Sequence, residues 1–138
     1  MIPKFRAWDK RENTMRDVAV LHFTKGGKVN SIEYWKTPSE LKSYHVRNLV
    51  LMQSTGLKDK NGVEIFEGDL VEHDDNINGT WETFEACEIV YDGDYAQFCF
   101  KNDASNFLSY YRNLCIIGNI HENPELLEKA SEEDDSKV

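Results

Sequence analysis

The chain has 138 residues, of which 40% are hydrophobic and 12% aromatic, and its formal net charge is -9. This composition fits a single globular domain with a self-sufficient core and argues against disorder over most of the chain. No apolar run approaches the ~20 residues of a membrane span, and charged residues occur throughout positions 4–12 where a signal peptide would need an apolar core, so we expect a cytosolic protein.

Charge is distributed unevenly along the chain. Residues 1–50 contain ten Lys or Arg against five Asp or Glu, a net charge of +5, whereas residues 51–138 contain six against twenty, a net charge of -14. The acidic half repels phosphate backbones and disfavours non-specific nucleic-acid binding, but the basic half leaves that function open. The asymmetry equally favours head-to-tail association between copies.

The N-terminal part reads mainly as strands. Residues 4–8 are a short predicted strand, and residues 9–13 are a polar turn. Residues 18–23 and 29–35 are rich in β-branched and aromatic side chains, and the glycine-containing segment 24–28 joins them, which predicts a hairpin.

A capping motif follows these strands. Thr37, Pro38, Ser39 and Glu40 place an N-cap, a proline at the first helical position and a glutamate at the third. Such a capping box satisfies backbone donors that are otherwise unpaired at a helix start. The motif predicts a short helix over residues 38–45 that covers one end of the sheet.

Turn chemistry is densest in residues 52–70, where three glycines fall six residues apart, at Gly56, Gly62 and Gly68. Each glycine stands where a strand would have to end or bend. The Asn61-Gly62 pair tolerates the positive φ of a tight turn, so a hairpin tip is predicted near residues 59–62, with positive φ at Gly62.

Asp69 is a candidate site residue with two interpretations. Its carboxylate beside Gly68 could serve a functional site. An aspartate at this position can also accept backbone N–H bonds across a bend, and we favour that structural role. Gly68 and Asp69 are therefore predicted to mark a sharp bend before a strand that begins at Leu70.

The second half of the chain consists of short predicted strands joined by tight turns. The predicted strands cover residues 48–55, 70–73, 82–91, 95–100 and 114–120. Asp103 is predicted to cap a helical turn that extends to Tyr111. The fold class is therefore mainly β (α+β), with short, strongly bent strands, a few short helices and a C-terminal half that resembles an SH3-like barrel.

Three segments carry a family resemblance: MQSTGLKDKNGVEIFEGDLV at residues 52–71, KFRAWD at residues 4–9, and IGNIHENPELL at residues 117–127, which contains Gly118, Asn119 and Pro124. Together they resemble the YopX family, small proteins of phages and prophages. The resemblance implies one domain and a location in the cytoplasm of a host cell. It implies no catalytic residues, because the family is known mainly as phage-encoded and uncharacterised.

On this basis we expect a single YopX-like domain over residues 1–130. Within it, residues 1–47 are a β-rich part with a short helix, residues 48–122 are barrel-like, and residues 123–130 are a terminal helix that Asn123 and Pro124 begin. Residues 131–138, with four consecutive acidic residues, are predicted to be a flexible tail.

No catalytic, cofactor-binding or metal-binding residue is assigned. The sequence has no Walker loop, G-x-G-x-x-G, H-E-x-x-H or G-x-S-x-G motif, and its four histidines lie at least 23 residues apart. Cys87, Cys99 and Cys115 form no C-x-x-C pair, which suits small buried hydrophobes in a reducing compartment; a nucleophile or ligand role is the alternative. Tyr110 and Tyr111 are a possible binding surface, because adjacent residues cannot both face one side of an element.

Residues 74–85 fit the calcium-loop pattern D-x-[DN]-x-[DN]-G-x5-E, with Asp74, Asn76, Asn78 and Glu85 as candidate side-chain ligands. The segments on both sides read as strands, whereas an EF-hand loop needs a helix on each side. A polar hairpin loop produces the same residue types. We therefore predict that calcium leaves the melting temperature unchanged, since an ion bound only by the folded state must raise it.

Three functional hypotheses follow. The leading one is a non-enzymatic phage accessory protein that binds a protein partner, including other copies of itself. The alternative is a nucleic-acid-associated regulator that uses the basic N-terminal part, and the third is an enzyme whose site is assembled across strands. A salt titration separates the first two, because phosphate binding weakens steeply as salt rises.

Overall fold

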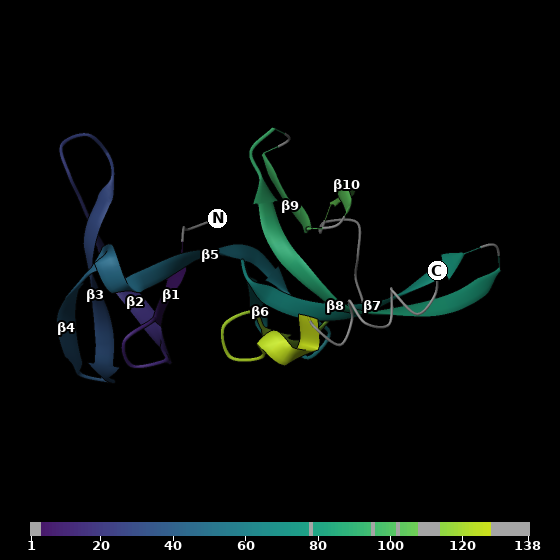
Figure 1. The fold of residues 1–138 in the computed structure, drawn as a ribbon, viewed down its shortest axis with the longest axis horizontal. Coiled ribbons are helices and arrows are strands. Elements are labelled where there is room, and N and C mark those ends of the chain that lie inside the picture. Colours follow the sequence, from purple (N-terminus) through teal and green to yellow (C-terminus); the bar gives the residue numbers. More distant parts are fainter. Residues whose placement is uncertain (1–3, 78, 95, 102, 108–113, 128–138) are drawn as a thin grey trace. The chain divides into compact units, whose positions relative to one another are not determined.

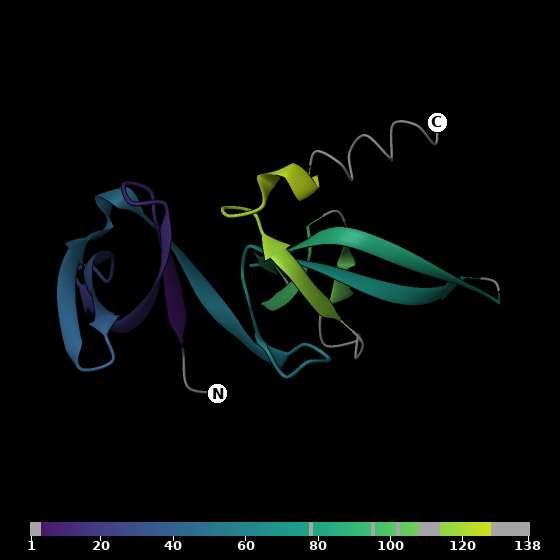
Figure 2. The same ribbon diagram turned by 90° about the horizontal axis from the view of Figure 1, so that it is seen from below.

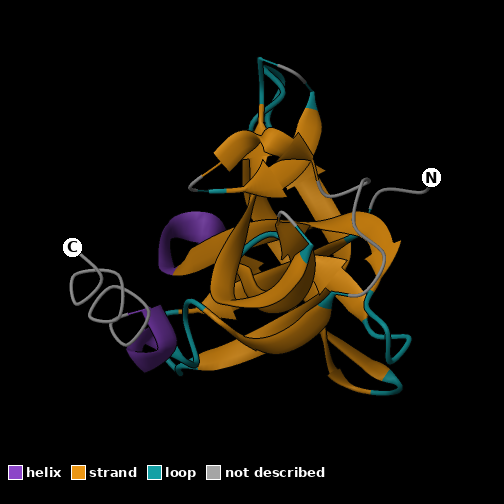
Figure 3. Ribbon diagram, turned by 90° about the vertical axis from the view of Figure 1, so that its right-hand side faces the viewer, coloured by secondary structure: helices purple, strands orange, loops and turns teal. Residues whose placement is uncertain are grey.

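A computed structural model describes residues 4–77, 79–94, 96–101, 103–107 and 114–127. Its strands form a six-stranded and a five-stranded antiparallel sheet, and helical segments are few and short (Figure 1, Figure 3). The mainly β fold predicted from the sequence is confirmed. Among the described residues, no helix is long and apolar enough to cross a membrane.

The chain forms two compact units, Met1–Ser54 and Thr55–Val138, which we call unit 1 and unit 2. The sequence placed the corresponding division at residues 47 and 48. The observed division falls within strand β5 (Leu49–Lys58), because the first half of that strand pairs with β1 as far as Gln53. The second half belongs to unit 2, where β6 (Glu64–Phe66) lies beside it.

Unit 1 is a meander of antiparallel strands in which each strand pairs with the next in sequence, and β5 then pairs with β1. The strands are β1 (Phe5–Asp9), β2 (Thr14–Phe23), β3 (Val29–Thr37) and β4 (Glu40–His45), followed by the 3-10 helix η1 (Val46–Asn48). The predicted hairpin between residues 18–23 and 29–35 is confirmed. The core cluster is formed by Ala7, Ile32, Tyr34 and Leu49.

The helix predicted over residues 38–45 is wrong, because this segment is the β3–β4 turn followed by β4. The Thr37 hydroxyl accepts a hydrogen bond from the Ser39 N–H at 3.4 Å, which is a local turn rather than a helix cap. Strand β4 pairs with β3 along its length and places Tyr44 opposite the core residue Ile32, while its other residues are exposed. Backbone pairing with β3 therefore outweighs the capping pattern.

Unit 2 contains the five-stranded sheet, with strand order β10-β9-β8-β7-β11. The strands are β7 (Asp69–Ile77), β8 (Thr80–Asp92), β9 (Gln97–Phe100), β10 (Asp103–Phe107) and β11 (Cys115–Asn119). Figure 2 shows β11 beside β7, to which it is hydrogen-bonded. The core cluster of this unit is formed by Ile65, Val71, Ile89, Phe100 and Leu114.

The turns that the glycines predict are present. Gly62 lies in the turn between β5 and β6 with a φ of 81°, and its N–H donates to the Asp59 carbonyl at 3.0 Å. Gly68 has a φ of 82° at the turn that precedes β7, and Gly56 has a φ of 77° within β5. A side chain at these positions would be strained, since positive φ favours glycine.

Two other predictions for the second half need correction. Residues 103–107 form strand β10 rather than a helical turn, because they pair with β9. The five-stranded sheet is open, with β10 and β11 at its edges, so the SH3-like barrel is not found in the described residues. Residues 124–127 are helical, and the rest of the predicted terminal helix lies outside the described residues, as does the tail.

Candidate functional site

An open groove with a volume of about 740 Å³ lies on unit 1. Strand β2 supplies most of it, and the starts of β1 and β3 and the middle of β5 complete it. The described lining residues are Lys4, Phe5, Val18, Ala19, Val20, Leu21, Phe23, Val29 and Gln53. Apolar side chains therefore dominate a surface that is open to solvent.

The groove exists because the core of unit 1 is small and is not fully covered. Val18, Leu21 and Val29 point to the same side of the sheet as Tyr34 and Ile32, and they pack against the core cluster while remaining partly exposed. Phe23 is 60% exposed. Large apolar surface left in contact with water is unfavourable, so such a groove is a typical docking surface.

Three lysines line the groove or adjoin it in sequence. Lys4 is the one charged side chain among the described lining residues, and Lys25 and Lys28 are exposed in the turn between β2 and β3, next to Phe23 and Val29 in sequence. Unit 1 as a whole has ten Lys or Arg against five Asp or Glu, a net charge of +5. An acidic ligand with an apolar side chain suits this surface.

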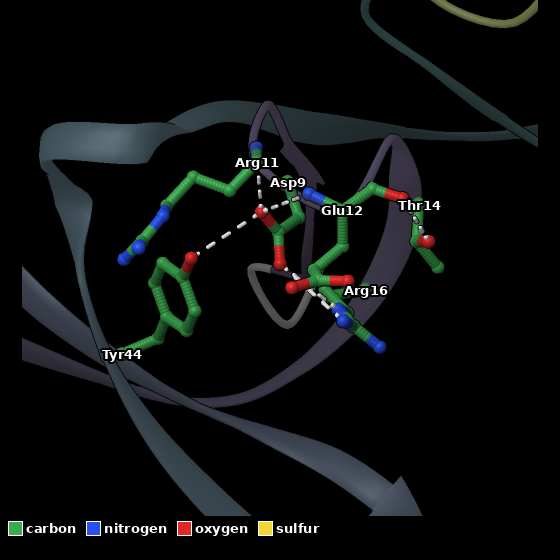
Figure 4. Close-up of polar contacts among 6 residues, drawn as sticks. All are labelled: Asp9, Arg11, Glu12, Thr14, Arg16 and Tyr44. Atoms are coloured by element: carbon green, nitrogen blue, oxygen red, sulfur yellow. Dashed lines mark hydrogen bonds and ion pairs between the residues drawn. The ribbon is translucent and has the colours of Figure 1, made fainter.

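Asp9 holds the first hairpin of unit 1 in place (Figure 4). Its side chain is fully buried. One carboxylate oxygen accepts hydrogen bonds from the backbone N–H groups of Arg11 and Glu12 at 3.0 and 3.2 Å, and from the Tyr44 hydroxyl at 3.4 Å. The other accepts from the Arg16 guanidinium at 3.3 and 3.4 Å.

These contacts keep the Asp9 carboxylate charged. Burial raises its pKa, but the backbone N–H groups and the Arg16 guanidinium outweigh burial and hold the pKa below its usual value. Arg16 also lies 4.7 Å from the centre of the Tyr34 ring, a cation–π contact with a core residue. The cluster therefore stabilises β1, β2 and β4, and the carboxylate is not free to react.

Asp59 plays the corresponding role in unit 2. It accepts backbone hydrogen bonds from Asn61 and Val63 at 2.9 Å each and from Ile116 at 3.1 Å, which ties the β5–β6 turn to β11. Burial raises its pKa, but the N–H groups of Val63, Ile116 and Asn61 outweigh burial and hold the pKa below its usual value. The nearby Lys60 charge lowers the pKa of Asp59 further.

The sequence-predicted residue Asp69 lies at the bend, with its side chain almost fully buried. It accepts a hydrogen bond from the Phe66 N–H at 2.8 Å. This is the structural role that the sequence favoured, a carboxylate that accepts a backbone N–H across the turn at Gly68. Asp69 is far from the groove in sequence and belongs to the other unit.

Gly118, Asn119 and Pro124 form the transition from β11 to the last helical turn. A Cβ atom on Gly118 would lie 2.5 Å from the Asn123 side-chain oxygen, so a glycine is required there. The Asn119 side-chain oxygen accepts the N–H groups of His121 and Glu122 at 3.0 and 2.8 Å. Pro124 is the first helical residue. These residues have a structural role in turn formation.

None of the remaining candidates that the structure describes lines the groove. Tyr110 and Tyr111 lie outside the described residues. The calcium-like segment is a hairpin in which Asp74 pairs with Thr83 and Asn76 with Trp81, and Asn78 lies outside the described part. Within the described residues, no group of three or more His, Cys, Asp or Glu could hold a metal ion. Cys87, Cys99 and Cys115 form no disulfide with one another, and Cys99 is buried.

Sequence reasoning missed the groove, Asp9 and Asp59. An aspartate that opens a polar turn, as in Asp9-Lys10-Arg11-Glu12 and Asp59-Lys60-Asn61-Gly62, is a signal for side-chain capping of the following N–H groups. No local signal marks the groove, because its walls come from four strands.

Comparison with known proteins agrees with this fold. The family model described as YopX protein matches residues 4–128. The chain is also similar to the crystal structure of protein EF1440 from Enterococcus faecalis, at 34% sequence identity and a TM-score of 0.63, over 92% of this chain and 99% of that chain. No curated protein matches the sequence.

Proposed function

The chain belongs to the YopX family, and from this premise we propose that it is a non-enzymatic accessory protein of a phage or prophage that binds a protein partner through the groove of unit 1. The cytoplasm of the host is the proposed location. The observation that supports this function most strongly is the apolar, solvent-open groove, whose one charged lining residue among those described is Lys4.

The buried carboxylates support a binding role rather than catalysis. Asp9, Asp59 and Asp69 all accept backbone N–H groups, and the pKa values of Asp9 and Asp59 are lowered by these contacts. A general base needs a pKa near the working pH and access to substrate. These three side chains instead secure turns in the interior of each unit.

Capture of proteins on the immobilised full-length chain tests the function, with bacterial lysate as the source. The Phe23→Asp variant places a charge in the groove, and Trp35→Ala, on the same strand pair but outside the groove, is the matched control. We expect a captured protein to survive nuclease treatment, to be lost with Phe23→Asp and to be retained with Trp35→Ala. Capture that is unaffected by Phe23→Asp would contradict the groove as the binding site.

Nucleic-acid binding is the second candidate, favoured by the net charge of +5 on unit 1. Fluorescence anisotropy with a labelled DNA duplex and a labelled RNA strand tests it across a salt series. Phosphate contacts predict an affinity that falls steeply and log-linearly with salt, by about one power of the salt concentration for each phosphate neutralised. Binding that is absent at low salt would remove this candidate.

A further inference from the structure

The hairpin formed by β7 and β8 combines three features that complement the groove. It extends beyond the other strands of unit 2 as a long arm (Figure 1). It carries Trp81, which at 69% exposure is the most exposed large hydrophobic side chain among the described residues. Residues 72–85 contain five Asp or Glu and no Lys or Arg.

The acidity of this arm is part of a longer pattern. Between Lys60 and Lys101 the sequence has eleven acidic residues and no Lys or Arg. Trp81 pairs with Asn76 near the tip of this arm, and its large exposed apolar surface is costly in water. The arm is therefore suited to a basic surface with an apolar floor.

The groove of unit 1 is such a surface, with apolar lining residues and lysines beside them. Its described lining is apolar except for Lys4 and Gln53, and Lys25 and Lys28 are exposed at the adjoining turn. Its volume of about 740 Å³ exceeds what one side chain needs, so the tryptophan and its strand neighbours can enter together. Unit 1 carries +5 and unit 2 carries -14, which favours contact between unlike units of two copies.

We propose that the groove of unit 1 binds the β7–β8 hairpin of a second copy of this chain, with Trp81 as the anchoring side chain. This inference rests on the proposed function and names its partner. Burial of Trp81 supplies the affinity, and the lysines of the groove and its adjoining β2–β3 turn select the orientation together with the acids of the hairpin. The contact is head-to-tail, so two copies can exchange hairpins reciprocally or several copies can form a ring or chain.

Sedimentation velocity of the full-length chain over a concentration series tests the proposal. We expect the wild type to associate as concentration rises, and Trp81→Ala and Phe23→Asp each to weaken association by at least about tenfold. Trp35→Ala is the matched control, since Trp35 is also exposed but does not line the groove. A wild type that stays monomeric, or association that Trp81→Ala leaves unchanged, would overturn the proposal.

Mixing the two variants gives the sharper test. Trp81→Ala retains an intact groove, and Phe23→Asp retains an intact hairpin. Each variant alone should associate at least about tenfold more weakly than the wild type, whereas a mixture should form a 1:1 complex through one intact contact. Failure of the mixture to form this complex overturns the proposal. Both variants change exposed side chains, and unchanged melting temperatures establish that each is folded.

The same variants separate this inference from the proposed function. A monomeric wild type whose protein capture is still lost with Phe23→Asp would exclude the hairpin as the ligand and leave the groove as a binding site. If Phe23→Asp changes neither association nor capture, both proposals fail.

Discussion

The two units of this protein stabilise buried carboxylates in different ways. In the basic unit 1, Asp9 is held by two backbone N–H groups, a tyrosine hydroxyl and the Arg16 guanidinium. In the acidic unit 2, Asp59 is held by three backbone N–H groups. Both pKa values lie below their usual range, so both arrangements favour the charged form.

Backbone donors therefore carry most of the stabilisation of the buried charge in unit 2, and the Lys60 charge adds to it. In unit 1, the Arg16 guanidinium donates directly to the buried carboxylate. The net charge is -14 in unit 2 and +5 in unit 1, which contains the apolar groove. This separation of charge favours contact between unlike units of two copies.

The largest effect is expected from Asp59→Ala in unit 2. The change leaves the N–H groups of Asn61, Val63 and Ile116 without their buried acceptor. Each unsatisfied group costs about 1–3 kcal/mol, so we expect the free energy of unfolding to fall by about 3–5 kcal/mol in total. Urea unfolding measures it. Asp59→Asn is the matched control, because its carbonyl oxygen keeps part of the network. Equal, small losses for both variants would show that the backbone does not depend on this side chain.

Gly118→Ala is expected to cause the next largest loss of stability. Its Cβ would lie 2.5 Å from the Asn123 side-chain oxygen, which also accepts the Asn119 N–H at 3.2 Å, so Asn123 must move. Overpacking of this kind costs about 1–3 kcal/mol. Gly93→Ala is the control, since a Cβ there meets nothing within 4 Å. The melting temperature should fall for Gly118→Ala alone, and a fall of the same size for both would contradict the geometric reason.

Arg16→Met removes the cation that donates to Asp9 in unit 1 and keeps an apolar side chain beside Tyr34. We expect a loss of about 1–2 kcal/mol, because one charged hydrogen-bond donor to Asp9 is removed and the backbone donors remain. A carboxylate with a lowered pKa stabilises the fold above its unfolded pKa, near 3.9, and this stability is lost as pH falls through the folded pKa. The variant raises the pKa of Asp9, so acid unfolding should begin at a higher pH. An acid-unfolding transition identical to that of the wild type would contradict the role of Arg16 in lowering the pKa of Asp9.

Gly62→Val should have the smallest effect. Gly62 has a φ of 81° and open space around its Cβ position, so the cost is backbone strain without a clash, on the order of 1 kcal/mol. Thermal unfolding measures it. Gly62→Asn, which tolerates this conformation better, should lose less. Unchanged stability of Gly62→Val would show that the turn does not require glycine.

The strands of both units were largely predictable from local pattern. Alternation and turn residues located the hairpins at residues 24–28 and 59–62, because period-two burial and positive φ are local properties. The helix predicted at residues 38–45 failed because the same proline and threonine also suit a β-turn, and pairing of Tyr44 with Ile32 decided the outcome.

The candidate site was not predictable in the same way. Phe5, Val18, Phe23 and Val29 come from three strands, and which apolar residues stay open to solvent depends on how much of the core each strand covers. The partners of Asp59 are also non-local, since Ile116 lies 57 positions away in sequence. The charge asymmetry was visible in the sequence, but its division between two compact units required the fold.

An NMR dilution series on the full-length, nitrogen-15-labelled chain tests docking of the hairpin into the groove most directly. We expect concentration-dependent shifts in the backbone amides of Val18, Phe23 and Val29 and in the Trp81 indole, with Leu41 on β4 unchanged. Spectra that do not depend on concentration, or shifts confined to β4, would contradict docking of the acidic hairpin into the groove of unit 1.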